Sequence, residues 1–182
     1  PSMTDSLIEL GLVERLIGVT ENSSIPKPMA SRICLVGTPE MIDVERIISM
    51  APDIVLANKA ENESEGIERL QEAGISIWGA FPHSVAENIS LLWSLVTLFM
   101  IQTSAAPKMR YLEMTLDWVV HAFAQIEPAR YFCPIWQSEK TDRGICWKNF
   151  GPGTYYHDLL RICGGMNIFS QNTSNYPLAF DL

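Results

Sequence analysis

Aromatic side chains are concentrated in one stretch of the chain, residues 134–158, which reads PIWQSEKTDRGICWKNFGPGTYYHD. Large planar ligands are held mainly by apolar and aromatic surface with few polar groups, and this stretch has that composition. The candidate ligand-binding residues here are Trp136, Trp147, Phe150 and Tyr155. The alternative is that the rings fill a hydrophobic core. Both interpretations stay open for the tryptophans, whereas packing at a helix start is favoured for Tyr155 and its neighbour Tyr156.

Polar residues follow a short apolar run in the first half of the chain. Residues 54–57, Ile-Val-Leu-Ala, show no polar alternation, which indicates a strand covered on both faces. Ligands gather beyond the carboxyl ends of such strands, so Asn58, Lys59 and Asn62 are further candidates for ligand contact. A solvated turn that leads into the next helix is the alternative, and it is favoured for any single one of these residues.

Motifs of catalysis and metal binding are absent from the sequence. It contains no G-x-S-x-G, G-x-x-x-x-G-K-[ST] or H-E-x-x-H pattern, so no catalytic residue is assigned. His83, His121 and His157 fall on different predicted elements, which is poor evidence for one metal site. The four cysteines show no C-x-x-C spacing. We therefore expect a protein that is not an enzyme and carries no metal or cofactor. The amides at the start of a helix near Thr154 suit an anion, but a plain helix cap is favoured there.

Composition narrows the classes of partner. The chain has 182 residues, 47% of them hydrophobic, with a formal net charge of -8 and a pI near 4.8. Nucleic-acid binding needs clustered Lys and Arg, and this acidic balance argues against it. The uncharged stretch 88–107 is interrupted by polar residues, and its strongly apolar part is too short to span a bilayer. It therefore predicts a buried helix. The chain does not open with the pattern of a signal peptide.

Strands and helices alternate through the first half of the chain. The sequence predicts strands at 16–20, 32–37, 53–58 and 75–81, and helices within 42–52 and 63–74. Such alternation with short connections is typical of βαβ units that build a parallel sheet. We therefore expect an α/β lobe over residues 1–85.

The second half begins with helices and ends in an unfinished α/β pattern. A capping box at 84–87 opens the apolar helix, and a long helix is predicted from Lys108 to Glu127. Beyond Pro128 come a strand at 130–136, a glycine-containing loop, a helix at 155–163 and the segment GGMNIF. We therefore divide the chain into the lobe 1–85, a helical region 86–128 and an incomplete α/β lobe 129–182.

Four segments, in order, resemble a known family across almost the whole chain. They are PSMTDSLIELGLVERLIGVT, VERIISMAPDIVLANKAEN, IERLQEAGISIW and GPGTYYHDLLRICGGMNIF, followed by NYP. Together they are similar to the periplasmic substrate-binding proteins of ABC importers for cobalamin, haem and ferric siderophores. The resemblance implies two Rossmann-like lobes joined by one long helix, with the ligand held between the lobes, in the periplasm or cell envelope. Against the family pattern, the sequence is expected to be truncated at both ends.

The resemblance also assigns partners and roles. It implies that the protein delivers its ligand to an ABC-transporter permease and that Glu45 docks on that permease. The alternative for Glu45 is an ordinary surface ion pair with a basic neighbour such as Arg46. The implied ligand is a corrinoid, haem or a ferric siderophore. The segment VTENSSIPKP is less aromatic than its counterpart in cobalamin-binding members, which weighs against a corrinoid.

Other functions stay open at this point. One is a non-transport α/β sensor; another is an oligomerised remnant, a homo-oligomer whose copies cover the incomplete lobe 129–182, because an unfinished sheet leaves open edges. A divalent-metal receptor is disfavoured by the scattered histidines. An enzyme of Rossmann type ranks last because no motif supports it.

Overall fold

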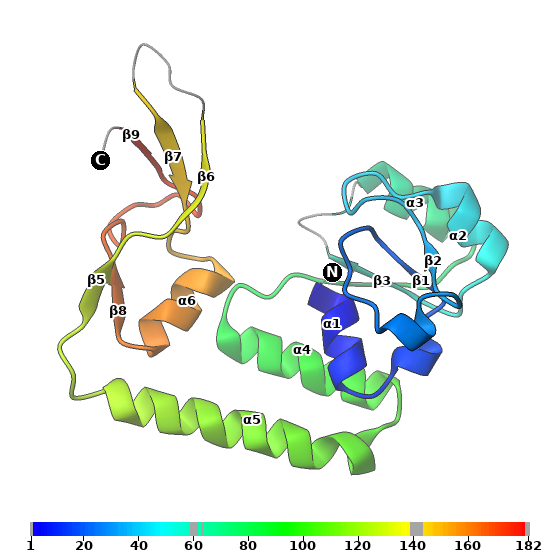
Figure 1. Ribbon diagram of the computed structural model, residues 1–182, viewed down its shortest axis with the longest axis horizontal. Coiled ribbons are helices and arrows are strands. Elements are labelled where there is room, and N and C mark those ends of the chain that lie inside the picture. Colours follow the sequence, from blue (N-terminus) through cyan, green and yellow to red (C-terminus); the bar gives the residue numbers. More distant parts are fainter. Residues whose placement is uncertain (1, 59–61, 63, 139–143, 181–182) are drawn as a thin grey trace. The chain divides into compact units, whose positions relative to one another are not determined.

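The computed structural model describes residues 2–58, 62, 64–138 and 144–180. The chain forms two compact units, Pro1–Phe81 and Pro82–Leu182, both built from helices and strands (Figure 1). The helices of the predicted region 86–128 lie in the second unit, together with residues 129–182.

The first unit alternates helices and strands as predicted. Its elements are α1 (Ser2–Glu9), η1 (Val13–Arg15), β1 (Gly18–Val19), η2 (Lys27–Met29), β2 (Cys34–Leu35), α2 (Val44–Met50), β3 (Val55–Asn58), α3 (Ser64–Glu72) and β4 (Ile77–Ala80). Strand β1 pairs in parallel with β2, and β3 pairs in parallel with β4. Each parallel pair is connected through a helical segment, which is the connection that parallel strands require.

The core of the first unit lies between α2, α3 and the strands. Val36, Val44, Ile47 and Leu70 form a buried cluster, against which half-buried residues of β3 and β4 pack. Val44 and Ile47 are three residues apart on α2, so they share one face of that helix. Burying an aliphatic side chain of this size stabilises the fold by roughly 1.5–3 kcal/mol.

Local signals in the sequence define the ends of these helices. Asp43 caps α2 by accepting a hydrogen bond from the backbone N–H of Arg46 at 3.0 Å. The helix stops at Ala51, which takes the left-handed conformation just before Pro52. Helix α3 is followed by Gly74, whose φ of 83° is the left-handed conformation that glycine adopts without strain.

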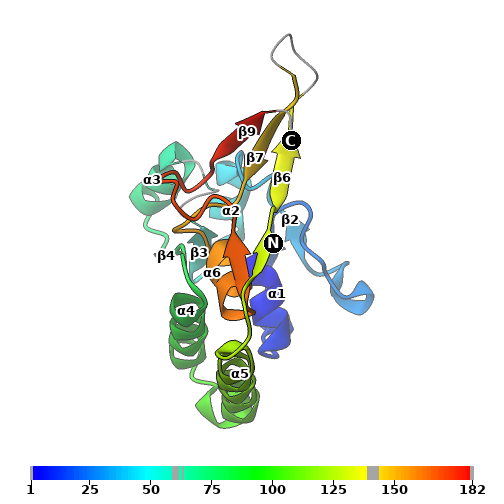
Figure 2. The same ribbon diagram turned by 90° about the vertical axis from the view of Figure 1, so that its left-hand side faces the viewer.

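The second unit carries the longest helices and the antiparallel strands. Its elements are α4 (Val85–Leu98), α5 (Gln102–Phe123), β5 (Ala129–Tyr131), β6 (Pro134–Gln137), β7 (Cys146–Asn149), α6 (Tyr155–Ile162), β8 (Gly165–Asn167) and β9 (Leu178–Phe180). Strands β5 and β8 pair in parallel, and the chain between them contains β6, β7 and α6. Strand β7 lies between β6 and β9 in a three-stranded antiparallel sheet (Figure 2).

Two strand predictions in this unit were wrong. The predicted strand 130–136 is divided into β5, which pairs with β8, and β6, which pairs with β7. Strand β6 begins at Pro134, because a proline without an N–H is tolerated at the first position of a strand. The predicted glycine-containing loop contains β7, which pairs on both sides. Its short CWKN segment has no alternation long enough to indicate a strand from sequence alone.

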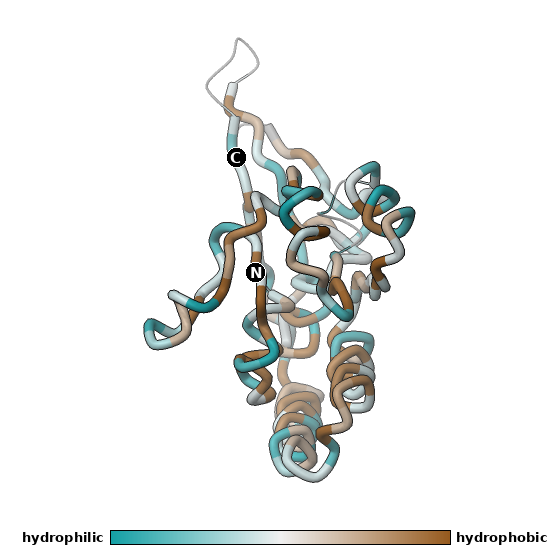
Figure 3. Tube along the Cα trace, turned by 90° about the vertical axis from the view of Figure 1, so that its right-hand side faces the viewer, coloured by the Kyte–Doolittle hydropathy of each residue, from teal (hydrophilic) through white to brown (hydrophobic). Residues whose placement is uncertain are grey.

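Helix α5 begins six residues before the predicted start at Lys108 and contains Pro107. Pro107 is exposed, so the carbonyl that loses its intrahelical partner can bond to water. Helices α4 and α5 pack together, and Trp93 Nε1 donates to Glu113 Oε1 at 2.7 Å. In Figure 3 α4 is largely hydrophobic along its length, but only its residues Val85, Leu95 and Val96 are buried, so the predicted buried helix is buried only in part. Among the residues described, none of the helices is long and apolar enough to cross a membrane.

Candidate ligand-binding site

One face of the β6–β7–β9 sheet presents a row of large exposed side chains. Trp136 on β6 lies opposite Lys148 on β7, and Lys148 lies opposite Leu178 on β9. Directly opposed residues share a face, so the three side chains are neighbours. Trp136 is 56% exposed, and Lys148 and Leu178 are exposed as well. A flat apolar ligand can lie on such a face with a cation beside it.

Further aromatic rings continue from this row. The Lys148 Nζ atom lies 4.8 Å from the ring centre of Tyr176, a cation–π distance. The ring of Phe150 lies 6.5 Å from Tyr176 and 4.6 Å from Tyr156. Tyr156 also meets Tyr155 edge to face at 5.5 Å. We use the name aromatic surface for Trp136, Lys148, Phe150, Tyr156 and Tyr176.

Backbone hydrogen bonds hold the two segments that carry these rings. Asn149 N–H donates to the Pro177 carbonyl at 3.0 Å, and Gly151 N–H donates to the Asn175 carbonyl at 2.8 Å. Thr154 Oγ1 donates to the Gly151 carbonyl at 2.8 Å and accepts the N–H of His157, which caps α6. Residues 149–154 and 175–177 are therefore fixed against one another, and Phe150 and Tyr176 with them.

A buried amide fixes the ionisation of a histidine at the same end of α6. Asn167 is 3% exposed; its Oδ1 accepts the N–H of Phe169 at 2.9 Å, and its Nδ2 donates to the Phe150 carbonyl at 2.7 Å. That Nδ2 also lies 3.2 Å from His157 Nδ1, and Tyr131 Oη lies 3.3 Å from the same nitrogen. Because an amide nitrogen only donates, His157 Nδ1 accepts, and the ring proton is on Nε2.

The pKa values in this network follow from burial. Burial lowers the pKa of His157, with a further lowering from the Arg161 guanidinium. Burial also raises the pKa of Tyr131, although its hydrogen bond with Asn167 opposes that shift. Both side chains are therefore neutral near pH 7. The network is consistent with a structural support for the aromatic surface rather than a source of charge.

Trp147, a sequence candidate, lies on the opposite face of the sheet. Its partner on β6 is Gln137, one residue along from Trp136, and successive residues of a strand point to opposite faces. The ring of Trp147 meets Phe132 edge to face at 6.3 Å. The structure thus connects Trp136, Phe150 and Tyr155 through side-chain contacts of the aromatic surface and separates Trp147 from them. Ligand contact by any of the four stays a prediction.

In the first unit, the candidate asparagines bond to each other and to the loop that precedes α2. Asn58 N–H donates to Asn62 Oδ1 at 2.7 Å, and Asn62 Nδ2 donates to the Pro39 carbonyl at 2.8 Å. This arrangement shapes the chain after β3, as the solvated-turn interpretation expects. Lys59 lies outside the described residues. The ligand role proposed for these residues stays a prediction.

Glu45 is an exposed carboxylate on α2. It pairs with Arg69 of α3, whose Nη2 lies 2.5 Å from Glu45 Oε1, rather than with the adjacent Arg46. Its side chain is 77% exposed, so the pair contributes little to stability and remains reachable by a partner. The docking role of Glu45 stays a prediction.

Sequence reasoning missed Lys148 and Tyr176. Lys148 sits in the strand that the sequence did not indicate, and Tyr176 is far along the chain, so no local pattern connects them. In the described part of the chain, no group of three His, Cys, Asp or Glu side chains is placed to hold a metal ion.

Comparison with known proteins decides the family. The family described as periplasmic binding protein matches residues 1–179. The chain belongs to this family. The resemblance drawn from the sequence and the α/β fold class are thereby confirmed. Proteins from two species of Vibrio are similar in sequence. The vitamin B12-binding protein of Vibrio campbellii is 29% identical over 97% of this chain, and that of Vibrio cholerae is 27% identical over the same share.

Several solved structures share the fold of this chain. The periplasmic vitamin B12-binding protein of Vibrio cholerae is 26% identical with a TM-score of 0.73. The match covers 97% of this chain and 66% of the Vibrio cholerae chain. An ABC-transporter substrate-binding protein of Listeria monocytogenes gives a TM-score of 0.78 at 20% identity. This match covers 97% of this chain and 65% of the Listeria chain. The periplasmic haem-binding protein BhuT gives a TM-score of 0.76 at 18% identity. The chain spans 62% of the length of the Vibrio campbellii relative.

Proposed function

We propose that this chain is the substrate-binding component of an ABC importer that captures a cobalamin-like, haem or ferric-siderophore ligand. The observation that carries the proposal is the family match over residues 1–179. It is supported by relatives named vitamin B12-binding proteins, which align with 97% of the chain. On this proposal the protein is not an enzyme, needs no cofactor, and works in the periplasm or cell envelope.

The aromatic surface provides a physical basis for capture. Trp136, Tyr156 and Tyr176 are exposed, and each ring offers a large rigid area at little cost in conformational entropy. Lys148 places a positive charge beside these rings. Haem carries carboxylates and many ferric siderophores are anionic, whereas cobinamide has no carboxylate. The lysine therefore favours an acidic ligand among the three classes.

Binding is tested by isothermal titration calorimetry of the purified chain with cobinamide, haem and an anionic ferric siderophore. We expect saturable binding of at least one ligand, and the replacement Trp136→Ala is expected to weaken it about tenfold or more. Trp118→Ala is the matched control, because Trp118 is similarly exposed but lies on α5. A chain that binds none of the three overturns the proposal for this sequence.

The role of the Lys148 charge in ligand binding is tested by a substitution that removes the charge. Lys148→Met keeps the length of the side chain and removes the charge, so it should weaken an acidic ligand and leave cobinamide unchanged. Equal weakening of both ligands would show that Lys148 acts through packing alone.

Delivery to a permease through Glu45 is the second step of the proposed function. Replacing Glu45 by Gln should weaken association with membranes that contain the cognate permease, measured by co-sedimentation. The matched control is Glu65→Gln, another exposed glutamate in the first unit. Equal association of the two variants would remove Glu45 from the docking surface.

A further inference from the structure

The amide of Asn167 has an orientation that does not depend on His157. Its Oδ1 accepts the N–H of Phe169 at 2.9 Å, and its Nδ2 donates to the carbonyl of Phe150 at 2.7 Å. Exchanging the two amide atoms would set a donor against an N–H and an acceptor against a carbonyl, so both bonds would be lost. Asn167 is 3% exposed, and water cannot replace bonds that are lost at a buried amide. The amide nitrogen therefore faces His157 whatever the protonation state of the imidazole.

Protonation of His157 sets two donors against each other. Asn167 Nδ2 lies 3.2 Å from His157 Nδ1, and the neutral ring accepts there because its own proton is on Nε2. An added proton goes to Nδ1, and one N–H then points at another. Tyr131 Oη lies 3.3 Å from the same Nδ1 and can accept from the imidazolium. The charged ring therefore keeps Tyr131 as a partner and repels Asn167.

The groups around His157 oppose its charge but do not forbid it. Burial lowers the pKa of His157 most, Arg161 of the same helix lowers it further, and Asp158 of that helix raises it. From β5 the titratable neighbour is Tyr131, which is uncharged near neutral pH because burial and the adjacent Cys133 raise its pKa. The titration of His157 in the folded chain therefore falls below the ordinary histidine value of 6.5.

Helices α4 and α5 also pack against α6 and bring their own titratable groups. In the last turns of α5, Asp117 and His121 pair with each other at 3.3 Å, and each side chain is 76% exposed. At the start of α4, Glu87 Oε2 accepts the backbone N–H of His83 at 2.7 Å. Both carboxylates thus have a bonded partner other than His157.

His83 provides a matched comparison for His157 at the same end of α6. Its Nδ1 lies 3.0 Å from the carbonyl of Gly153, and because a carbonyl only accepts, this nitrogen carries the proton. A second proton goes to Nε2 and leaves the bond to Gly153 in place. Protonation of His83 therefore preserves its contact with the loop before α6, whereas protonation of His157 disrupts one.

Phe150 connects this network to the aromatic surface. Asn167 holds its carbonyl, and its ring lies 4.6 Å from Tyr156 and 6.5 Å from Tyr176. We propose that His157 is a proton switch for the aromatic surface. The neutral ring keeps Asn167 on Phe150, whereas the imidazolium displaces Asn167, frees the rings to move and lowers their affinity for ligand. Only the last of these steps rests on the proposed function, because movement of the rings is measurable without ligand.

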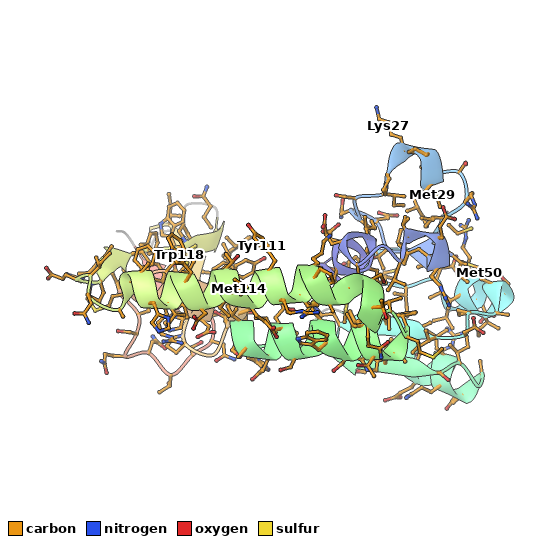
Figure 4. The ribbon with its side chains drawn as sticks, turned by 90° about the horizontal axis from the view of Figure 1, so that it is seen from below. Lys27, Met29, Met50, Tyr111, Met114 and Trp118 are labelled. Carbon is orange, nitrogen blue, oxygen red and sulfur yellow. The ribbon has the colours of Figure 1, made fainter. Side chains whose placement is uncertain are left out.

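Ring movement is tested in the free chain by NMR with isotope labels on the tyrosine rings. The chain has five tyrosines. The signals of Tyr156 and Tyr176 should shift together with those of His157 between about pH 8 and pH 5, because the ring of Phe150 lies near both. Tyr111 is the internal reference, since it lies on α5 and is 72% exposed (Figure 4). Signals of Tyr156 and Tyr176 that do not follow His157 overturn the proposal.

Two variants separate the histidines. His157→Asn keeps an acceptor near the position of Nδ1 and cannot take up a proton, so the pH-dependent shifts of Tyr156 and Tyr176 should disappear. His83→Asn should retain them. Far-ultraviolet circular dichroism at each pH confirms that the chain is folded. Shifts that persist in His157→Asn, or that coincide with unfolding, exclude a switch at His157.

The opposition of donors is tested by changing the amide to a carboxylate. Asn167→Asp places an acceptor against His157 Nδ1, so the pKa of His157 should rise above 6.5 instead of being lowered. The imidazole signals report this pKa in both chains. A pKa that stays lowered in a folded Asn167→Asp chain contradicts the proposal. If this variant does not fold, the comparison of wild type with His157→Asn decides.

The ligand step is tested by calorimetry with cobinamide, haem and an anionic ferric siderophore at about pH 8 and pH 5. Relative to His157→Asn, the wild type should lose about tenfold in affinity as the pH falls. Any titration of the ligand itself affects both chains equally and drops out of the comparison. If neither chain binds at the higher pH, the proposed function fails, and the tyrosine signals still decide whether the switch exists. If both chains bind with the same pH dependence, the switch does not act on ligand affinity and the proposal is overturned.

Discussion

Asp158 of α6 accepts the backbone N–H of Val85, the first residue of α4, at 2.9 Å across 73 residues of sequence. The same carboxylate forms an ion pair with Arg161, whose Nη2 lies 2.7 Å from Asp158 Oδ1. The first amides of a helix have no partner within the helix, so α4 is capped both by its own Ser84 and by a side chain from a distant element. Asp158 thus joins the apolar helix to the helix that begins beside the aromatic surface.

Removing this carboxylate should destabilise the protein. Asp158→Ala leaves the N–H of the buried residue Val85 without this acceptor, which predicts a loss of about 1–3 kcal/mol in the free energy of unfolding. Urea denaturation followed by circular dichroism measures that loss. Asp117→Ala is the control, because Asp117 is 76% exposed and its removal should change stability far less. Equal losses in the two variants would contradict a special role for Asp158.

His157 should make stability depend on pH. Because burial lowers the pKa of His157 in the folded protein, the unfolded chain takes up its proton first as the pH falls. The free energy of unfolding should therefore decrease as the pH falls below the ordinary histidine value of 6.5, until the folded pKa is reached. Burial raises the pKa of Asp158, but the hydrogen bonds from Val85 and Arg161 outweigh burial and lower that pKa below 3.8. The contribution of Asp158 to the free energy of unfolding is therefore lost only at more acidic pH.

The measurement is a series of urea titrations between about pH 5 and pH 8, where His157 titrates and Asp158 does not. The replacement His157→Asn keeps an acceptor near the position of Nδ1 but cannot take up a proton, so its curve should be flatter than that of the wild type. The comparison variant His121→Asn removes an exposed histidine. A flatter curve in that variant, with no change on replacing His157, would refute the assignment.

The order of helices and strands in the first unit could be predicted because its signals are local, whereas the expected parallel sheet is two separate two-stranded sheets in the described residues. Asp43 and Gly74 mark helix ends through their own chemistry, and the apolar run before Asn58 indicated a strand that the structure contains. Apolar periodicity also identified α5, although its start was placed at Lys108. The exposed position of Pro107 permits the earlier start, and exposure is a property of the folded state that composition does not reveal.

The second unit was harder because its sheet depends on distant segments. Strand β7 is held by β6 on one side and by β9 on the other, and the pairing of Lys148 with Leu178 joins residues 30 apart in sequence. The aromatic content of residues 134–158 did predict a group of neighbouring rings. It could not show that Trp136 and Trp147 point to opposite faces, because that outcome follows from the register of β6 and β7.

Core packing in the first unit predicts a large difference between two leucines. Leu70 is fully buried in the cluster with Val36, Val44 and Ile47, so Leu70→Ala should cost about 2–5 kcal/mol through lost burial and the cavity left behind. Leu35 is 50% exposed, and Leu35→Ala makes the same chemical change with little burial to lose. Thermal and urea unfolding of both variants give the comparison. Similar losses would mean that the cluster is not the core of this unit.

Gly151 should be the most sensitive glycine near the aromatic surface. A methyl group at this position would lie 2.4 Å from the Ser174 carbonyl oxygen and 2.6 Å from Pro177 Cδ, so the segment 174–177 must move. We expect Gly151→Ala to cost about 2 kcal/mol or more, as overpacking typically does. Gly74→Ala is the control for backbone strain, because Gly74 has a φ of 83° and no atom within 4 Å of the added methyl group.

Movement of segment 174–177 also displaces Tyr176 from Phe150 and Lys148, so the Gly151 variant should bind ligand more weakly while the Gly74 variant binds as the wild type does. Calorimetry on both variants at a temperature where each is folded separates these effects. A Gly151 variant that loses stability but keeps full affinity would show that the ligand does not use Tyr176.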